Sequence, residues 1–190
     1  PFIDTDTSGF APTIMNTSRD PFALFLDAHE DIRVALATLQ RLSAVRPDAR
    51  PTDQDRADAQ GLAGFLERHI LPHHREEERE FWPLVARAEG TPEEREAFNR
   101  LAQRLQAEHA ELEHRWSAVA SNLHELAAGR ATSIDGTALA EFAQRYREHA
   151  MLEDEVLVPL ARHLLAPTEQ NRLAVSVLLS RLPAGKWGMV

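Results

Sequence analysis

The sequence contains no cysteine, and this absence removes disulfide bonds, thiolate metal sites and cysteine catalysis together. The strong metal ligands that remain are His, Asp and Glu, and the chain carries 9 histidines. No apolar run approaches the roughly 20 residues that a membrane helix needs, so we expect no membrane partner. Basic residues are outnumbered, because 21 Lys and Arg stand against 30 Asp and Glu and give a net charge of -9. Proteins that bind a phosphate backbone present a basic surface, so we expect no nucleic-acid partner.

The start of the chain lacks the basic and apolar regions of a secretory signal and carries Asp4 and Asp6 instead. We therefore expect the protein to be cytoplasmic. A length of 190 residues with a hydrophobic fraction of 43% suits a single globular domain. We divide the chain into an extended N-terminal arm over residues 1–19, a helical domain over residues 20–165, and a short helix with a tail over residues 166–190.

Helix start signals, each followed by a long stretch without turn residues, predict an all-α fold. The signals are Asp20 before Pro21, Thr52, Thr91 with Pro92 and Glu94, Asp135, and Pro167. We expect long helices over about 20–45, 53–88, 91–129 and 135–165, and a short fifth helix over 167–179. Pro72 and Pro83 remove backbone hydrogen bonds, so kinks are expected at both. Four long helices with short connections predict an up-down antiparallel four-helix bundle.

The sequence repeats itself at its histidines. The second and fourth helices share the pattern His-x-x-x-Glu-x5-Pro at a constant separation of 76 residues, at His73, Glu77 and Pro83 and at His149, Glu153 and Pro159. The helix before each of them carries one histidine within an apolar stripe, His29 in the first helix and His109 in the third. A histidine and a glutamate four residues apart lie on one face of an α-helix, so each pair can serve one metal. Apart from Glu77, the acidic run over residues 75–80 is expected to face solvent.

The core of the bundle would then hold four imidazoles and two carboxylates, and buried carboxylates are unfavourable without positive charge beside them. Two cations satisfy every group if the carboxylates bridge them and two histidines bind each ion: Glu77 and Glu153 between the ions, His29 and His73 on one, His109 and His149 on the other. Nitrogen and carboxylate ligands without thiolate suit iron, then manganese, with zinc possible.

With these residues the sequence resembles the hemerythrin-like proteins, the HHE cation-binding family. The resemblance lies in LDAHEDI around His29, HHREEEREFWPL with His73 and Glu77, QAEHAEL around His109, and HAMLEDEVLVPL with His149 and Glu153. It covers about residues 20–165. It implies an up-down four-helix bundle around a non-haem centre of two iron ions with an oxo or hydroxo bridge. The activities of that family include dioxygen carriage, oxygen or iron sensing, nitric oxide chemistry and iron-sulfur repair.

Two positions depart from the oxygen carriers of that family, and both lie near the second iron. Glu113 stands where the carriers have a histidine, and Glu153 comes four residues after its histidine, where the carriers have an aspartate after five. Simple reversible oxygen carriage is therefore not expected. Some members draw a further ligand from the residue after the second-helix histidine, so His74 is our preferred seventh ligand. Glu113, His69 and Tyr146 stay open as ligands or as residues that support the ligands.

We expect a non-haem di-iron protein that binds or reacts with dioxygen, nitric oxide or peroxide. A non-enzymatic iron or oxygen sensor, or an iron store, would use the same ligands and stays an alternative. A metal-free helical interaction module, in which the six residues are only buried or exposed polar groups, is the third interpretation.

Overall fold

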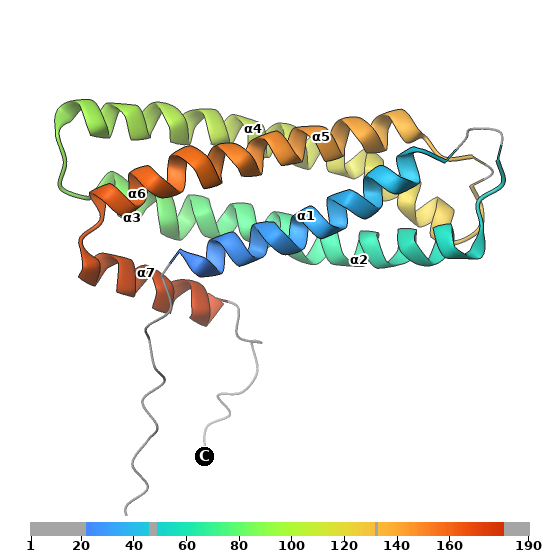
Figure 1. Cartoon of the computed structure of the whole chain (residues 1–190), viewed down its shortest axis with the longest axis horizontal. Helices are drawn as coiled ribbons and strands as arrows, with labels where there is room; N and C mark the ends of the chain where they lie inside the picture. Colours follow the sequence, from blue (N-terminus) through green and yellow to red (C-terminus); the bar gives the residue numbers. More distant parts are fainter. Residues whose placement is uncertain (1–21, 46–48, 132, 181–190) are drawn as a thin grey trace, which may run out of the picture.

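The computed structural model describes residues 22–45, 49–131 and 133–180, and within these ranges the chain is all-α (Figure 1). The long helices are α1 (Ala23–Ser43), α2 (Asp53–Glu76) continued by the π turn η1 (Glu77–Phe81) and α3 (Trp82–Ala86), α4 (Pro92–Ala127), and α5 (Gly136–Leu152) continued by the π turn η2 (Glu153–Leu157) and α6 (Val158–Leu164). The short helix α7 (Pro167–Ser180) follows them. The predicted all-α antiparallel bundle is confirmed.

The four long helices surround a common core. α1 packs against α2 and α5, and α4 packs against the same two helices on the other side. α7 turns back along the end of the bundle formed by α3 and α6, where it contacts η1 and α1 (Figure 1). No described helix combines the length and the apolar character that crossing a bilayer requires.

Most helix starts follow the expected capping chemistry. Thr52 and Thr91 each form a capping box with the carboxylate three residues later, and Asp135 accepts a hydrogen bond from the backbone of Ala138. α4 ends just before Gly129, whose φ of 69° lies in the left-handed region that favours glycine. The expected cap at Asp20, the arm over 1–19 and the tail beyond residue 180 lie outside the described residues.

The connection into α5 requires a residue without a side chain. Gly136 lies so close to the end of α1 that a Cβ atom there would be 2.3 Å from the carbonyl oxygen of Ser43. Glycine therefore allows α5 to begin directly against α1, which fixes how these two helices pass each other.

The helices widen into π turns just before two of the prolines. Pro83 and Pro159 follow η1 and η2, and the backbone N–H of Trp82 bonds to the carbonyl of Glu77, five residues earlier. Proline lacks the N–H donor of a regular helix, so a wider turn accommodates it. The expected irregularity at Pro83 is therefore a π turn, whereas the helix stays α-helical through Pro72.

Two apolar clusters fill the bundle on either side of a polar layer. The first apolar cluster includes the fully buried side chains of Leu36, Leu39, Leu66, Leu123 and Phe142. The second apolar cluster includes those of Phe22, Phe81, Phe98, Leu105 and Leu157. Along each long helix the buried histidines lie between residues of the two clusters, so the polar residues form a layer that apolar side chains cover on both sides.

Candidate metal centre

The six expected ligands meet in this layer, and each is at most 6% exposed. Their histidines form two pairs. The Nε2 atoms of His29 and His73 are 2.8 Å apart, and those of His109 and His149 are 3.1 Å apart. The structure thus brings together the residues that the repeat predicts, in the pairing that the repeat predicts. Their role as metal ligands stays a prediction.

The carboxylates of Glu77 and Glu153 each reach both histidine pairs. Glu77 places Oε1 3.5 Å from Nε2 of His73 and Oε2 3.4 Å from Nε2 of His109. Glu153 places Oε2 3.2 Å from Nε2 of His29 and Oε1 3.2 Å from Nε2 of His149. Since each carboxylate has one oxygen beside each pair, both have the geometry of a bridge between two cations.

The buried carboxylates of the layer attract positive charge, which is seen in the pKa values of the groups around them. Burial, together with the nearby charge of Glu153, raises the pKa of Glu77 to about 7. Burial by itself lowers the pKa of His29 and of His109, but the surrounding carboxylates outweigh it and raise both to about 10. Burial and the positive charge on His29 hold the pKa of His73 well below its usual value. The carboxylates thus favour a proton on His29 in the first pair, and in the second pair they raise the pKa of both His109 and His149.

Several atoms of the layer also lack the hydrogen bonds that buried polar atoms normally make. Oε2 of Glu77 and both carboxylate oxygens of Glu153 have no partner in hydrogen-bond geometry among the described residues. Imidazole nitrogens and carboxylate oxygens without thiolate are a donor set for iron, manganese or zinc. The residues present therefore fit a centre of two such ions.

Two further carboxylates fix the imidazoles of the first and third helices. Nδ1 of His29 is 2.6 Å from Asp154, and Nδ1 of His109 is 2.9 Å from Glu78. Such contacts orient the ring of a metal-bound histidine. The expectation that the acidic run faces solvent is wrong for Glu78, because the wide π turn lets it and Glu77 both face inward. The separation of 76 residues also relates Glu78 to Asp154, and this extension of the repeat could have indicated them.

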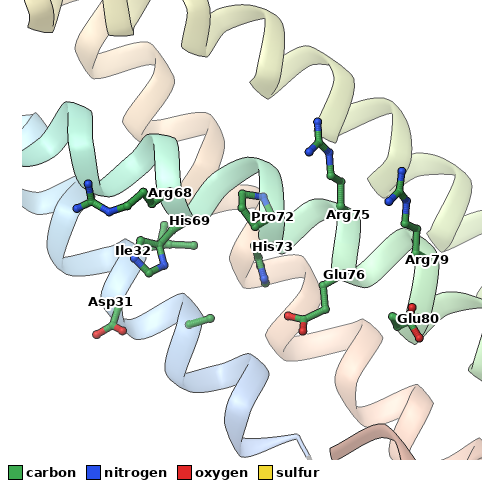
Figure 2. Close-up of a pocket in the computed structure, with 11 residues that line it drawn as sticks. Asp31, Ile32, Arg68, His69, Pro72, His73, Arg75, Glu76, Arg79 and Glu80 are labelled. Atoms are coloured by element: carbon green, nitrogen blue, oxygen red, sulfur yellow. The ribbon is translucent and has the colours of Figure 1, made fainter. Parts of the chain in front are cut away.

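The histidines of the second and fourth helices, His73 and His149, differ in whether a carboxylate contacts Nδ1 of the ring. Nδ1 of His149 is 3.1 Å from Glu108. Nδ1 of His73 is buried and has no hydrogen-bond partner among the described residues. His73 lies instead at the inner wall of a groove between α1 and α2 (Figure 2). Glu108 was not expected from the sequence; its position directly before His109 is the only signal for it.

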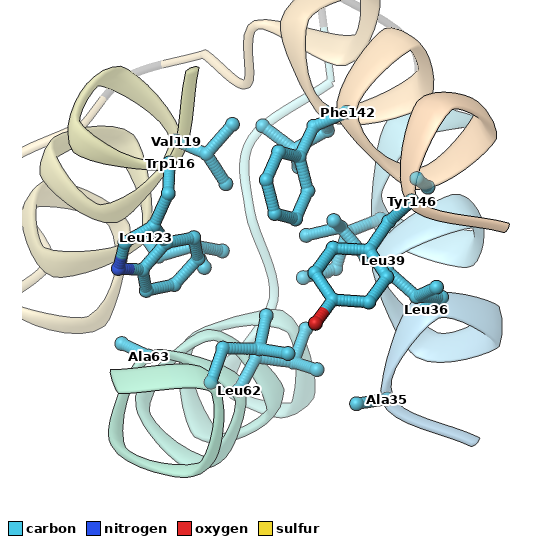
Figure 3. Close-up of a cluster of buried hydrophobic side chains, with 14 of the residues drawn as sticks. Ala35, Leu36, Leu39, Leu62, Ala63, Trp116, Val119, Leu123, Phe142 and Tyr146 are labelled. Atoms are coloured by element: carbon cyan, nitrogen blue, oxygen red, sulfur yellow. The ribbon is translucent and has the colours of Figure 1, made fainter. Parts of the chain in front are cut away.

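His74 and Tyr146 lie beside the second histidine pair. The ring of Tyr146 packs near Leu36 and Leu39 with its hydroxyl toward α2 (Figure 3), and this oxygen is 3.1 Å from Nε2 of His74. Nδ1 of His74 is 3.3 Å from a carboxylate oxygen of the half-exposed Glu113. Burial lowers the pKa of His74 and raises that of Tyr146, so both are neutral. The phenol therefore donates to His74, which donates to Glu113.

The ring of His74 also stacks on that of His109, with centroids 3.8 Å apart. Its nitrogens are close enough to those of His109 and His149 for the three to share an ion. His69 is not part of this group: its ring is exposed and stacks on Phe65 at 4.2 Å. The predictions that His74, Glu113, Tyr146 or His69 bind metal remain untested.

Comparison with known proteins assigns the fold and the layer to one family. The hemerythrin HHE cation-binding domain matches residues 20–161, which include all six residues of the layer and all of the four long helices except the last three residues of α6. Comparison with curated proteins gives no match. Since the match covers well over half of the chain, the chain belongs to the hemerythrin HHE cation-binding domain family.

Proposed function

We propose that the protein holds two iron ions in the polar layer and that dioxygen, nitric oxide or peroxide binds or reacts there. The ligands would be His29 and His73 on one ion and His109 and His149 on the other, with Glu77 and Glu153 between them. The observation that carries this proposal is the reach of each glutamate, which has one oxygen beside each histidine pair.

Iron bound in this way supplies open coordination positions and one-electron chemistry to a small ligand. The protein contributes the surroundings. Asp154, Glu78 and Glu108 hold three imidazoles in fixed orientations through their Nδ1 atoms. The two apolar clusters exclude bulk water from both sides of the layer, which strengthens the electrostatic interactions inside it.

The contacts of His74 favour a supporting role over metal binding, because both of its ring nitrogens already have protein partners. Stacked on His109, it fixes that ring. The chain from Tyr146 through His74 to Glu113 also holds a phenolic proton next to the layer. If His74 only supports, His74→Ala should keep both ions and alter the optical spectrum modestly, whereas loss of one ion would identify it as a ligand.

Metal analysis of the purified protein tests the first part of the proposal. Protein produced with ample iron should contain two irons per chain. Glu77→Gln should reduce the occupancy of both positions, because its carboxylate serves both ions. Retention of one iron at full affinity in Glu77→Gln would contradict the bridging assignment, and one metal or none in the wild type would contradict the centre itself.

Titration with azide or nitric oxide, followed by optical absorption, tests the second part. We expect saturable new bands in the wild type, His74→Ala and Glu113→Ala. If none of the three binds either probe while holding two irons, the reactive centre is excluded. The same ligands would then serve an iron sensor or an iron store.

A further inference from the structure

The repeat relates two surface grooves, one lined by His73 and the other by His149. The first groove lies between α1 and α2 and includes Ala28, Asp31, Ile32, His69, Pro72 and His73. The second groove includes the residues at the repeated positions, Glu108, Glu111, Leu112, Arg145, Glu148 and His149. The two grooves are therefore equivalent places in the two halves of the bundle.

One substitution within the repeat makes the grooves different. In the second groove Glu108 directly precedes His109, and its carboxylate is 3.1 Å from Nδ1 of His149. In the first groove the equivalent residue is Ala28, directly before His29. The volume of the first groove is about 540 Å³, against about 140 Å³ for the second. The alanine thus leaves open the place that a carboxylate fills in the other half.

His73 lines this groove and carries its hydrogen on Nδ1. Nε2 of His73 faces the centre, 2.8 Å from Nε2 of His29 and 3.5 Å from Glu77. The nitrogen left for the hydrogen is Nδ1, whether Nε2 accepts from His29 or binds a metal. This buried N–H donor has no acceptor among the described residues, and metal-binding histidines nearly always have one.

We propose that the first groove binds a small carboxylate, whose oxygen accepts the hydrogen bond of His73 and takes the place that Glu108 has beside His149. In the second groove the carboxylate of Glu108 lies between that imidazole and the guanidinium of Arg104, whose Nε is 2.8 Å from it. The lining of the first groove also includes Arg68, Arg75 and Arg79, and Figure 2 shows the guanidinium groups of Arg75 and Arg79 directed away from His73.

The rim of the first groove selects by shape and hydrogen bonding rather than by net charge. The residues that line it include equal numbers of arginines and carboxylates, because Asp31, Glu76 and Glu80 accompany the three arginines. A carboxylate therefore gains from the hydrogen bond that the buried imidazole N–H donates, a charge-assisted bond of the kind that Glu108 accepts from His149 in the second groove. A monocarboxylate such as formate or acetate is the smallest ligand with this chemistry.

The test compares the two grooves in one protein. Histidine-labelled full-length chain is titrated with formate or acetate at constant ionic strength, first metal-free and then loaded with diamagnetic zinc. The Nδ1–H resonances of His73 and His149 are followed by nuclear magnetic resonance. We expect a saturable shift at His73 in both forms and none at His149. This result does not depend on iron or on the small-molecule chemistry proposed above.

Variants that exchange the two positions sharpen the test. Ala28→Glu supplies the carboxylate within the chain and should weaken acetate binding at His73 at least tenfold. Glu108→Ala opens the second groove and should create a saturable shift at His149, which keeps the proposal testable even if Ala28→Glu does not fold. Glu148→Gln, which lines the second groove and whose carboxylate bonds Gln144, is the control and should change neither titration.

Three results would overturn the proposal. One is the absence of a saturable shift at His73 in both metal forms, which means that water alone occupies the groove. Another is equal acetate affinity in Ala28→Glu and the wild type. The third is a preference for phosphate at His73 with no response to formate or acetate.

Discussion

The contact between Asp154 and His29 should contribute strongly to metal affinity. It is the shortest of the contacts between a carboxylate and an inner histidine, at 2.6 Å, and the Asp154 side chain is only 15% exposed. Arg33 pairs with the same carboxylate and holds it in place. A charged acceptor raises the basicity of the imidazole and fixes the orientation of its ring, and loss of such a partner typically lowers metal affinity about 10- to 100-fold.

We expect Asp154→Ala to lower iron affinity toward the upper end of that range, or about 2.8 kcal/mol at about 1.4 kcal/mol per tenfold change. Asp154→Asn keeps an oxygen acceptor without its charge, so its loss should be about tenfold. Glu108→Ala should lose less than Asp154→Ala, because Glu108 is farther from its histidine, at 3.1 Å, and more exposed, at 27%. The expected loss of iron affinity on removing a carboxylate is therefore larger when that carboxylate lies closer to its histidine and is more deeply buried.

Anaerobic competition with a chromogenic iron chelator measures these affinities, and urea unfolding of the metal-free variants separates them from changes in folding. Glu155→Gln is the matched control, because this neighbouring carboxylate is exposed. The reasoning fails if Asp154→Ala binds iron as tightly as the wild type. It fails equally if Glu155→Gln loses as much affinity as Asp154→Ala.

Two further predictions concern stability. Gly136→Ala places a methyl group against the carbonyl of Ser43 and should destabilise the fold by about 1–3 kcal/mol. Gly61→Ala, whose added methyl group would have nothing within 4 Å, should stabilise helix α2 by about 0.5–1 kcal/mol. Urea unfolding measures both changes, and an unchanged stability of Gly136→Ala would contradict the close approach of Gly136 to Ser43. For the metal-free protein, the pKa values of His29 and His109 rise from 6.5 to about 10 on folding. Their stabilisation is complete below pH 6.5 and is lost as the pH rises toward 10. Metal bound to these histidines would displace their protons, so the stability gained on adding metal should grow as the pH rises over that range. Thermal unfolding with and without metal at pH 6.5 and 9 measures this gain. A gain that shrinks with rising pH would refute the assignment of His29 and His109 as metal ligands.

The helices and the inner histidines could be predicted because both depend on local sequence. Capping residues such as Thr91 mark helix starts, and the spacing of His73 and Glu77 sets one helix face whatever surrounds it. Two copies of the same spacing then indicate that two helices face one centre. No long-range information was needed for this part of the site.

The carboxylates that contact the Nδ1 atoms of the histidines, such as Glu78 and Glu108, could not be predicted in the same way. Glu78 lies beside Glu77 in the sequence, and in a regular α-helix two neighbouring residues point about 100° apart. The π turn changes that relation, and a proline such as Pro83 signals an irregular backbone without specifying its form. The contact between Glu108 and His149 joins two different helices, so it depends on how α4 and α5 pack.

The π turns also determine where along each helix the apolar side chains can be buried. After His73, the inward residues of the second helix include Glu77, Phe81 and Val85, which follow in three successive steps of four. In a regular α-helix each such step would rotate the side chain by about 40°, so Val85 would drift away from the core. The extra residue of η1 cancels this drift, which means that the helix changes phase at the polar layer. Replacing the π turn η1 by a regular α-helical turn with the same number of residues would rotate the part of the second apolar cluster that follows it by about 100° relative to the first apolar cluster. Loss of the wide turn therefore cannot be repaired at the layer alone, because half of the core would have to repack with it.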